Sequence, residues 1–579
     1  MRLNERYTAV LIFFCSLLIF IPFLGSVHLF DWDEINFAEC AREMLVSGDY
    51  TTVQIGFLPF WEKPPLFIWM QAVSMKVFGI NEFGARFPNA LGGAFTIAVL
   101  YYLGKKIYDH RFGLLWAVSF AASVLPSFYF HSGIIDPWFN LFITLSIYQF
   151  AVYTSDFSPG GQQSFFNQRI FYSALFISLA VLTKGPVALL VFGLCFMIIR
   201  LLRRKPIISW QDFTLYTLSA LLIPSLWFIS LVIEGKGYIL KEFILYQIRL
   251  FSTEDAGHGH NFFYHWYILL IGCFPASVFA LKSLLSAKEG TDFEKGMFQW
   301  MRVLFWTVLI LFSVVKTKIV HYSSLCYFPL TYLSAVTLYR LMNGSTELKK
   351  WHKVLLIVTG LFFVIAFSVL PIIEQFKHYL IQGDLIKDEF AKGNLQATGS
   401  WKGFEWISGL LLLSGIVYSF VLLRRESINH FIIILFGSSL LSVTVAAMFI
   451  APRVEEYSQH AAIEFCKSAA GKEVYLETMG YKSYAHFFYG RLKEDAYLSK
   501  NYQKWKSENQ KTLYDPNLSE SENEMRLRRD WLLRGEIDKP AYFISKNISK
   551  KGIQEDYPEL KIEDEKNGFV LWKREITGN

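Results

Sequence analysis

Three acidic residues stand close together in one stretch of this sequence, FDWDEINFAEC, which contains Asp31, Asp33 and Glu34. The stretch follows a long apolar segment. Where carboxylates crowd at the edge of an apolar environment, desolvation and mutual repulsion raise a pKa towards that of a working base. Helix formation offers a simpler account, since Asp33 suits an N-cap and Glu34 suits a first turn, but capping needs only one acid. Capping does not explain all three, so Asp33 and Glu34 are candidate catalytic residues.

A second charged motif, FWEKPPLFIW, places Glu62 and Lys63 before Pro64 and Pro65. A lysine that reaches towards water beside a paired glutamate would account for it. However, a residue before proline is held in an extended conformation, and proline suits the first turn of the next helix. Lys63 is therefore predicted to be a rigidly held cation that binds a lipid-linked phosphate.

Further charged residues occur beside other apolar segments. Asp136, in IIDPWF, fits both a helix cap and a functional acid. Lys184, in LTKGP, has no acidic partner nearby in the sequence, and a phosphate would supply one. Arg249 and Lys316 lie in two more loops, so four cations, with Lys63 as the fourth, could converge on one anionic head group.

Candidates for a metal site are weak. The segment DAGHGHN contains His258 and His260, which could bind a divalent metal together with Glu62. A flexible glycine-rich loop with water-exposed histidines is the alternative that this spacing favours. The six cysteines are scattered and show no CxxC or Cys/His zinc spacing, so neither a disulfide framework nor a structural zinc is indicated.

The elements that carry these residues are predicted to be membrane helices. Of the 579 residues, 53% are hydrophobic and 18% are charged, and the mean hydropathy is +0.32, outside the usual range of a soluble domain. The net charge of +7 is spread along the loops, which argues against nucleic acid as a partner. A membrane span needs about 20 apolar helical residues. Thirteen runs qualify, near residues 7–28, 86–104, 113–130, 137–154, 168–183, 187–201, 213–233, 262–281, 301–315, 322–339, 354–373, 403–423 and 431–450.

Alternating spans divide the connections into two sets. The set that contains the N-terminus is the richer in Lys and Arg, with segments such as RLLRRK and ELKKWHK, so the positive-inside rule makes it cytoplasmic. The charged motifs described above all fall in the opposite, outward set. The first run lacks a small-residue cleavage site and is predicted to be retained as a span.

Two outward segments, residues 34–48 and 66–79, have the spacing of amphipathic helices at a membrane surface. The last part of the chain differs in character, because helix-like segments alternate there with the strand-like KEVYLET, AYFISKN and FVLWKRE. An odd number of spans places this part outward. The predicted fold class is therefore a polytopic α-helical membrane protein over residues 1–451, followed by a small soluble α/β domain over residues 452–579.

Five motifs, in order and spacing, resemble those of the membrane-embedded glycosyltransferases of the GT-C class. They are DWDEINFAECAREMLVSGDY, FWEKPPLFIWMQAVSMKVFGINEFGARFPNAL, IIDPWF, LTKGPVALL and KTKIVHYSSLCYFPL. The most similar branch comprises the bacterial relatives of protein O-mannosyltransferases and includes the aminoarabinose transferase that acts on lipid A. The likeness covers residues 1–340.

The resemblance implies a sugar donor linked to a polyprenyl phosphate, a lipid, protein or glycan acceptor, and inversion at the anomeric carbon. It also implies a cavity on the outer face of the bacterial inner membrane and no required cofactor, with a divalent metal only weakly supported. The family's motif residues fall, as acids of the reaction, on Asp33, Glu34 and Asp136, and, as ligands of the donor phosphate, on Lys63, Lys184, Arg249, Lys316 and Tyr322.

Two departures from the family pattern concern the identity of donor and acceptor. Asn36 and Phe37 stand where relatives carry an arginine and a tyrosine, and KTKIVHY lacks a proline that usually precedes its tyrosine. Two other functions also fit the sequence. A transporter or flippase for a lipid-linked sugar would place charges near the bilayer midplane, whereas here they cluster at one surface. A polysaccharide ligase or polymerase would use a diphosphate-linked glycan.

Overall fold

The computed structural model describes residues 5–157, 166–252, 260–286, 290–383, 386–494, 499–516 and 518–576, apart from the side chains of residues 5, 6 and 249–252.

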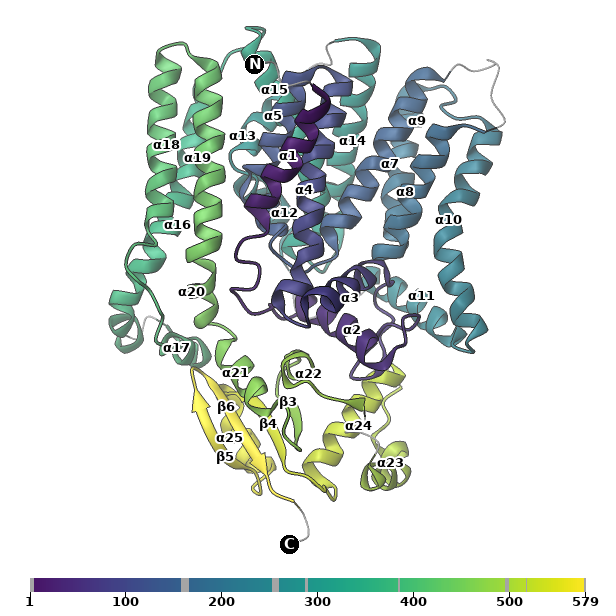
Figure 1. Ribbon diagram of the computed structural model, residues 1–579, viewed down its shortest axis with the longest axis vertical. Coiled ribbons are helices and arrows are strands. Elements are labelled where there is room, and N and C mark those ends of the chain that lie inside the picture. Colours follow the sequence, from purple (N-terminus) through teal and green to yellow (C-terminus); the bar gives the residue numbers. More distant parts are fainter. Residues whose placement is uncertain are drawn as a thin grey trace.

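Long, roughly parallel helices form the body of the molecule (Figure 1). Their sequences are runs of Leu, Ile, Phe and Val, and several begin at a side chain that accepts a hydrogen bond from the first turn, as Asn81 does for α4 and Ser209 for α10. The bundle consists of α1 (Glu5–Phe20), α4 (Glu82–Ile107), α5 (His110–Ala121), α6 (Val124–Tyr129), α7 (Asp136–Asp156), α8 (Gln168–Lys184), α9 (Val187–Arg203), α10 (Trp210–Ile233), α12 (Tyr264–Gly272), α13 (Ala276–Leu285), α14 (Asp292–Val314), α15 (Tyr327–Met342), α16 (Lys350–Gln382), α18 (Ile407–Arg424) and α19 (Ile428–Phe449).

The predicted fold class is confirmed, and each predicted apolar run contains a helix or consecutive short helices, although α1 ends at Phe20 and the rest of the run 7–28 is not helical. The run 113–130 is divided between α5 and α6, and the run 262–281 between α12 and α13. Within the described residues, five helices are long and apolar enough to cross a membrane by themselves: α10, α14, α16, α18 and the helix over 428–456. The chain is thus an integral membrane protein, and the number of thirteen spans stays a prediction.

A layer of short elements covers one end of the bundle, which we call the α2 end (Figure 1). It contains α2 (Asp33–Ser47), the two-stranded hairpin β1 (Gln54–Ile55) and β2 (Leu58–Pro59), α3 (Leu66–Phe78) and α11 (Gly237–Ser252). Helices α2 and α3 lie across the bundle axis, as their amphipathic patterns predict. The N-terminus lies at the opposite end (Figure 1).

The C-terminal part of the chain lies beyond this layer, also at the α2 end (Figure 1). A four-stranded sheet has the order β3-β4-β6-β5, with β3 parallel to β4 and the other pairs antiparallel. Strands β3, β4 and β6 match the three predicted strands. The elements are α20 (Ala451–Glu456), α21 (His460–Ala469), β3 (Tyr475–Met479), α22 (Ala485–Gly490), α23 (Lys500–Leu513), α24 (Glu520–Arg534), β4 (Ala541–Lys546), α25 (Lys550–Asp556), β5 (Lys561–Lys566) and β6 (Phe569–Arg574).

This C-terminal part shares a hydrophobic core with α2 and α3. Met44 of α2 and Ile68 of α3 belong to the same buried cluster as Ile463 of α21 and Phe488 of α22. The hairpin between β1 and β2 adds a polar contact, because Arg528 of α24 donates a hydrogen bond of 2.7 Å to a hairpin carbonyl. The sheet region is therefore packed onto the α2 end of the bundle and covers part of it.

Candidate active site

Asp33 is the first residue of α2 and faces a histidine from a distant segment. Oδ2 of Asp33 lies 3.1 Å from Nε2 of His321, which belongs to the 3₁₀ helix η1 (Val320–Cys326) before α15. Burial by itself raises the pKa of Asp33, but the hydrogen bond and charge of His321, with Lys63 and Lys184 nearby, outweigh it and hold this pKa well below its usual range. The expectation of a raised pKa is wrong for Asp33, because crowding with other acids matters less than these cations.

Glu34 is buried and fully engaged in an ion pair. Its two oxygens accept hydrogen bonds of 2.7 and 2.9 Å from Arg86 of α4. They also accept bonds from the backbone N–H groups of Phe30 and Gly133. A carboxylate with four such donors ties the start of α2 to the bundle, so Glu34 is arranged for positioning its neighbour Asp33.

Lys184 forms an ion pair with Asp136, so a phosphate is not its only possible partner. Nζ of Lys184 donates a hydrogen bond of 2.6 Å to Oδ1 of Asp136. The other oxygen, Oδ2, is buried and has no hydrogen-bond partner among the described residues. Nζ also lies 5.4 Å from the ring centre of Tyr322. The ion pair joins α7 to α8.

Glu62 and Lys63 are held together by a residue of α11. Oε2 of Glu62 lies 3.8 Å from Nζ of Lys63 and accepts a hydrogen bond of 3.0 Å from the Tyr246 hydroxyl. Nζ of Lys63 lies 5.6 Å from the centre of the Tyr246 ring. The lysine is therefore oriented by two residues, Glu62 and Tyr246, in keeping with the rigid position that Pro64 and Pro65 predict.

One cavity of about 700 Å³ brings these groups together. Besides charged and polar residues, its lining includes apolar side chains from α9 and α14, among them Val187, Val191, Leu311 and Phe312. A cavity of this kind suits a ligand with a charged head and an apolar tail. The predicted site residues that line it are Asp33, Glu34, Glu62, Lys63, Asp136, Lys184 and Tyr322.

The remaining predicted residues are placed differently. Lys316 is exposed and is not among the described residues that line the cavity, although its neighbour Thr317 is. Arg249 lies in α11, and its side chain is outside the described part of the structure. His258 also lies outside the described residues. His260 is exposed and stacks on Tyr264 with ring centres 4.4 Å apart.

The cavity also contains residues that the sequence pattern did not single out. His321 is the neighbour of Tyr322 in the motif KTKIVHY, so its position next to the site could have been predicted from the sequence. Lys482 and Tyr484 come from the loop after β3, and Glu522 comes from α24. Nothing in their local sequence indicates a site, because only the packing of the C-terminal part onto α2 brings them there.

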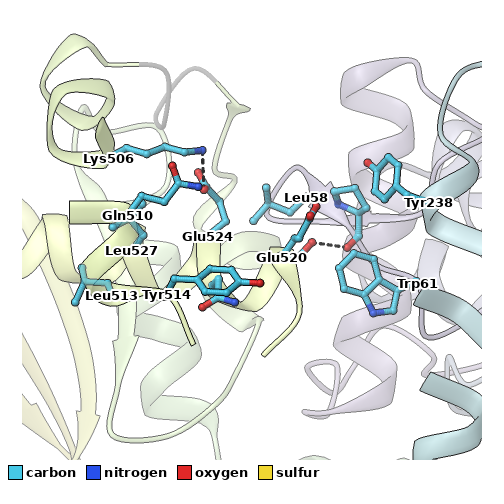
Figure 2. A pocket seen from close by; sticks show the side chains of 13 residues that line it. Leu58, Trp61, Tyr238, Lys506, Gln510, Leu513, Tyr514, Glu520, Glu524 and Leu527 are labelled. Atoms are coloured by element: carbon cyan, nitrogen blue, oxygen red, sulfur yellow. Dashed lines mark hydrogen bonds and ion pairs between the residues drawn. The ribbon is translucent and has the colours of Figure 1, made fainter. Parts of the chain in front are cut away.

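A smaller cavity of about 380 Å³ is lined by chain neighbours of residues that line the first. Trp61 and Tyr238 line it on one side, and Lys506 and Glu524 line it on the other (Figure 2). The loop before Pro64 contributes Trp61 to this cavity and Lys63 to the larger one. The first turn of α24 likewise contributes Glu520 and Ser521 to the smaller cavity and Glu522 to the larger one.

An apolar helical bundle with a charged cavity at one end, covered by amphipathic helices and a small α/β region, is the architecture of the membrane-embedded glycosyltransferases of the GT-C class. Among solved structures, ArnT from Cupriavidus metallidurans bound to undecaprenyl phosphate superposes with a TM-score of 0.71 at 18% identity and covers 97% of both chains. The apo oligosaccharyltransferase of Archaeoglobus fulgidus superposes with a TM-score of 0.51 at 11% identity, over 95% of this chain and 70% of that one. These likenesses establish the fold.

Sequence comparison leads to the same class. Residues 62–246 match the family model described as dolichyl-phosphate-mannose-protein mannosyltransferase. The undecaprenyl phosphate-alpha-4-amino-4-deoxy-L-arabinose arabinosyl transferase 1 of Proteus mirabilis is 28% identical over 356 residues, which are 60% of this chain and 62% of that enzyme. The chain thus spans somewhat less than two thirds of that relative's length. It resembles the GT-C glycosyltransferases and, among them, the aminoarabinose transferases.

Proposed function

We propose that this protein is a glycosyltransferase that moves a sugar from a polyprenyl-phosphate carrier to an acceptor. The observation that carries the proposal is the convergence of Asp33, Lys63 and Lys184 on one cavity that is also lined by apolar side chains of α9 and α14. The cations suit the phosphate, and the apolar side chains suit the isoprenoid chain. The named activity of the Proteus mirabilis relative, which uses an undecaprenyl phosphate sugar, supports the same donor class.

In the proposed reaction, Lys63 and Lys184 bind the donor phosphate. Negative charge grows on this phosphate as the glycosidic bond breaks, and fixed cations in a partly dry cavity stabilise that charge. Asp136 holds Lys184 at 2.6 Å, and Glu62 and Tyr246 hold Lys63. The two acids therefore orient cations and do not themselves react.

Asp33 is proposed to receive the acceptor. Its pKa is held low, so it is ionised and is a weak base at neutral pH. A weak base suffices because the proton of the attacking hydroxyl becomes acidic only as its oxygen bonds to a strongly cationic anomeric carbon. Asp33 accepts that hydrogen bond and then the proton. A single displacement of this kind inverts the anomeric carbon and forms no covalent glycosyl-enzyme.

The proposed location is the bacterial inner membrane, with the α2 end and the C-terminal part in the periplasm and the N-terminus in the cytoplasm. The basic loops that the sequence assigns to the cytoplasm support this orientation. The acceptor is proposed to be a lipid, such as a lipid A-like glycolipid, or a protein or glycan, which reaches the cavity from the periplasmic side. No cofactor is required in this mechanism, in which residues of the chain carry every step.

The test separates donor binding from transfer. Asp33→Asn should bind a polyprenyl-monophosphate sugar as the wild type does but transfer it at least about 100-fold more slowly, because proton transfer in the transition state is lost. Lys63→Met should weaken donor binding, whereas Lys76→Met, which changes an exposed lysine of α3, serves as the matched control.

The wild type and the three variants are assayed with monophosphate-linked and diphosphate-linked donors. Transfer by Asp33→Asn at a near-normal rate would remove Asp33 from the mechanism. Use of the diphosphate donor alone would favour the polysaccharide ligase, and movement of lipid across a vesicle membrane without transfer would favour the flippase.

A further inference from the structure

A second cluster of charged residues lies outside the cavity, where the chain passes from the bundle into its C-terminal part. Nδ1 of His28 lies 2.9 Å from Oε1 of Glu455, and Nδ1 of His460 lies 3.1 Å from Oε2 of the same carboxylate. One possible ligand atom from each of these residues lies within 4.8 Å of those of the other two. Among the described residues, this is the group of three or more His, Cys, Asp or Glu side chains whose atoms come this close together. We propose that His28, Glu455 and His460 bind one divalent transition-metal ion, for which zinc is the best match.

The three ligands stand on backbones that are already fixed. The side chain of Gln459 accepts a hydrogen bond from the N–H of Asp31 and donates one to the carbonyl of Leu29. Arg86 donates a hydrogen bond of 2.9 Å to the carbonyl of His28. The loop that carries His28 is therefore held between α4 and the start of α21, so little backbone entropy is lost when an ion binds.

The donor set selects the type of ion. Two imidazole nitrogens and one carboxylate oxygen are typical ligands of zinc, whereas magnesium and calcium prefer oxygen alone. Zinc bonds of about 2.0–2.2 Å in a tetrahedron place ligand atoms roughly 3.3 Å apart. Each imidazole nitrogen lies at about this distance from one oxygen of Glu455, His28 at 2.9 Å from Oε1 and His460 at 3.1 Å from Oε2. One ligand atom from each residue lies within 4.8 Å of the others, so small side-chain rotations bring the three to the spacing that zinc requires.

The burial of the cluster is also suitable. The side chain of Glu455 is 4% exposed, whereas that of His460 is 34% exposed. The ion thus has an approach from solvent on the His460 side and a fourth position for water. The buried carboxylate supplies the negative charge that compensates part of the charge of the ion.

The outer contacts of His28 fit the same role. Nε2 of His28 accepts a hydrogen bond of 2.6 Å from Lys467, so Nδ1 carries the ring hydrogen while no ion is bound. When Nδ1 binds the ion, that hydrogen moves to Nε2 and Lys467 must turn away. Lys467 is half exposed and already pairs with Glu464 at 3.5 Å. Oε1 of Glu464 lies 4.0 Å from Nε2 and can then accept the Nε2 hydrogen, as carboxylates do behind metal-bound histidines.

The ion would link three segments that meet at the α2 end. His28 precedes the loop that leads to Asp33, Glu455 lies in the last turn of α20, and His460 begins α21. A bond from each segment to one ion fixes the C-terminal part against the bundle and holds the cavity closed. This structural role does not depend on the proposed reaction.

Metal binding is measured on the full-length protein in detergent after chelator treatment and dialysis, with Zn²⁺ for elemental analysis and Co²⁺ as an optical probe. The wild type should retain about one Zn²⁺ per chain, give the visible absorption of a four-coordinate Co²⁺ site, and unfold at a higher temperature with Zn²⁺ than without it. His460→Ala and Glu455→Gln should lose all three signals, with Zn²⁺ affinity reduced by more than about 100-fold.

Two histidine variants are matched controls. His430→Ala removes an exposed imidazole that pairs with Ser427 at the far end of α19, and His260→Ala tests the metal site suggested by the sequence. Both should retain the ion. Loss of the ion in His260→Ala but not in His460→Ala would overturn the proposal. Equal unfolding temperatures of the wild type with and without Zn²⁺ would leave the cluster as an ion-pair network and would overturn it as well.

His460→Ala replaces a partly exposed side chain, so its unfolding temperature in chelator reports whether it folds. A value close to that of the wild type in chelator, together with no response to Zn²⁺, supports the metal site. A variant that still responds to Zn²⁺ as the wild type does contradicts it.

Discussion

At the scale of single residues, two aspartates in one loop are tuned in opposite directions. Asp33 faces His321 and two lysines, which hold its pKa well below the usual range despite burial. For Asp31, burial raises the pKa to about 6, and hydrogen bonds from Ser483 and the Tyr484 backbone offset only part of that rise. One residue is therefore ionised at every ordinary pH, whereas the other changes charge within the physiological range.

This difference predicts a pH dependence of donor binding. A phosphodiester-linked sugar does not titrate near pH 6, but Asp31 lines the same cavity and gains a negative charge as the pH rises through about 6. Donor affinity should therefore fall roughly three- to tenfold between pH 5 and pH 7, as expected for like charges at the edge of a cavity. Binding of a donor analogue measured across this range checks the prediction, and in Asp31→Asn the affinity should be flat. An unchanged slope in Asp31→Asn would assign the effect to another group.

The same shift has a consequence for stability. Because the folded protein holds the proton of Asp31 more tightly than the unfolded chain, this residue favours the folded state less as the pH rises from about 4 to about 6. The sign is opposite for Asp33, whose low folded pKa contributes stability that is lost only in strong acid.

At the scale of elements, the ends of helices determine which charged residues meet. Lys184 is the last residue of α8, and Asp136 is the first residue of α7. The two helices are consecutive and antiparallel, so these residues lie at the same end although they are far apart in the sequence. The apolar runs predict both helices, and this pairing follows from them. A search for partners among sequence neighbours misses it, which is why a phosphate seemed necessary as the partner of Lys184.

Other elements show where the sequence pattern is insufficient. Strand β5, with the sequence KIEDEK, is exposed along its whole length, so it lacks the alternation of apolar and polar residues that identifies a half-buried strand. Strands β3, β4 and β6 have buried apolar residues and were predictable. Burial against a partner produces the pattern, and an edge strand that faces water does not acquire it.

The ion pair between α2 and α4 predicts a specific loss of stability. Arg86 is buried, bonds to both oxygens of Glu34 and also donates to the carbonyls of Leu24, Val27 and His28. Arg86→Met should leave the carboxylate buried without a counter-charge and destabilise the protein by about 3–5 kcal/mol. A lower unfolding temperature in detergent, accompanied by slower sugar transfer because Asp33 is displaced, checks this prediction.

A double variant separates charge from packing. Glu34→Gln combined with Arg86→Met removes both charges, so it should recover part of the stability that Arg86→Met loses. Equal loss in the single and the double variant would show that Arg86 acts through its bonds to the backbone carbonyls and not through Glu34.

At the scale of the whole molecule, the cavity is assembled from three layers that the sequence describes separately. The bundle supplies Lys184, the covering layer supplies Asp33 and Lys63, and the C-terminal part supplies Lys482. The composition of the C-terminal part identifies it as an α/β region but not as a wall of the site. Its role depends on the buried contacts between α2, α3, α21 and α22, which join segments more than 400 positions apart in the sequence.

Lys482 provides the test of this arrangement. Its Nζ lies 5.3 Å from the centre of the Trp32 ring, immediately before Asp33, and 5.8 Å from that of Tyr484. A third cation in the lining of the cavity should add to the attraction of the donor phosphate, so Lys482→Met should weaken donor binding by about tenfold, or about 1.4 kcal/mol. Lys472→Met, at an exposed position of the same C-terminal part, is the matched control. Binding of a polyprenyl-phosphate analogue at two salt concentrations measures both effects, because loss of one cation also reduces the salt dependence. If Lys482→Met bound the analogue as Lys472→Met does, the C-terminal part would act on the site only by covering it.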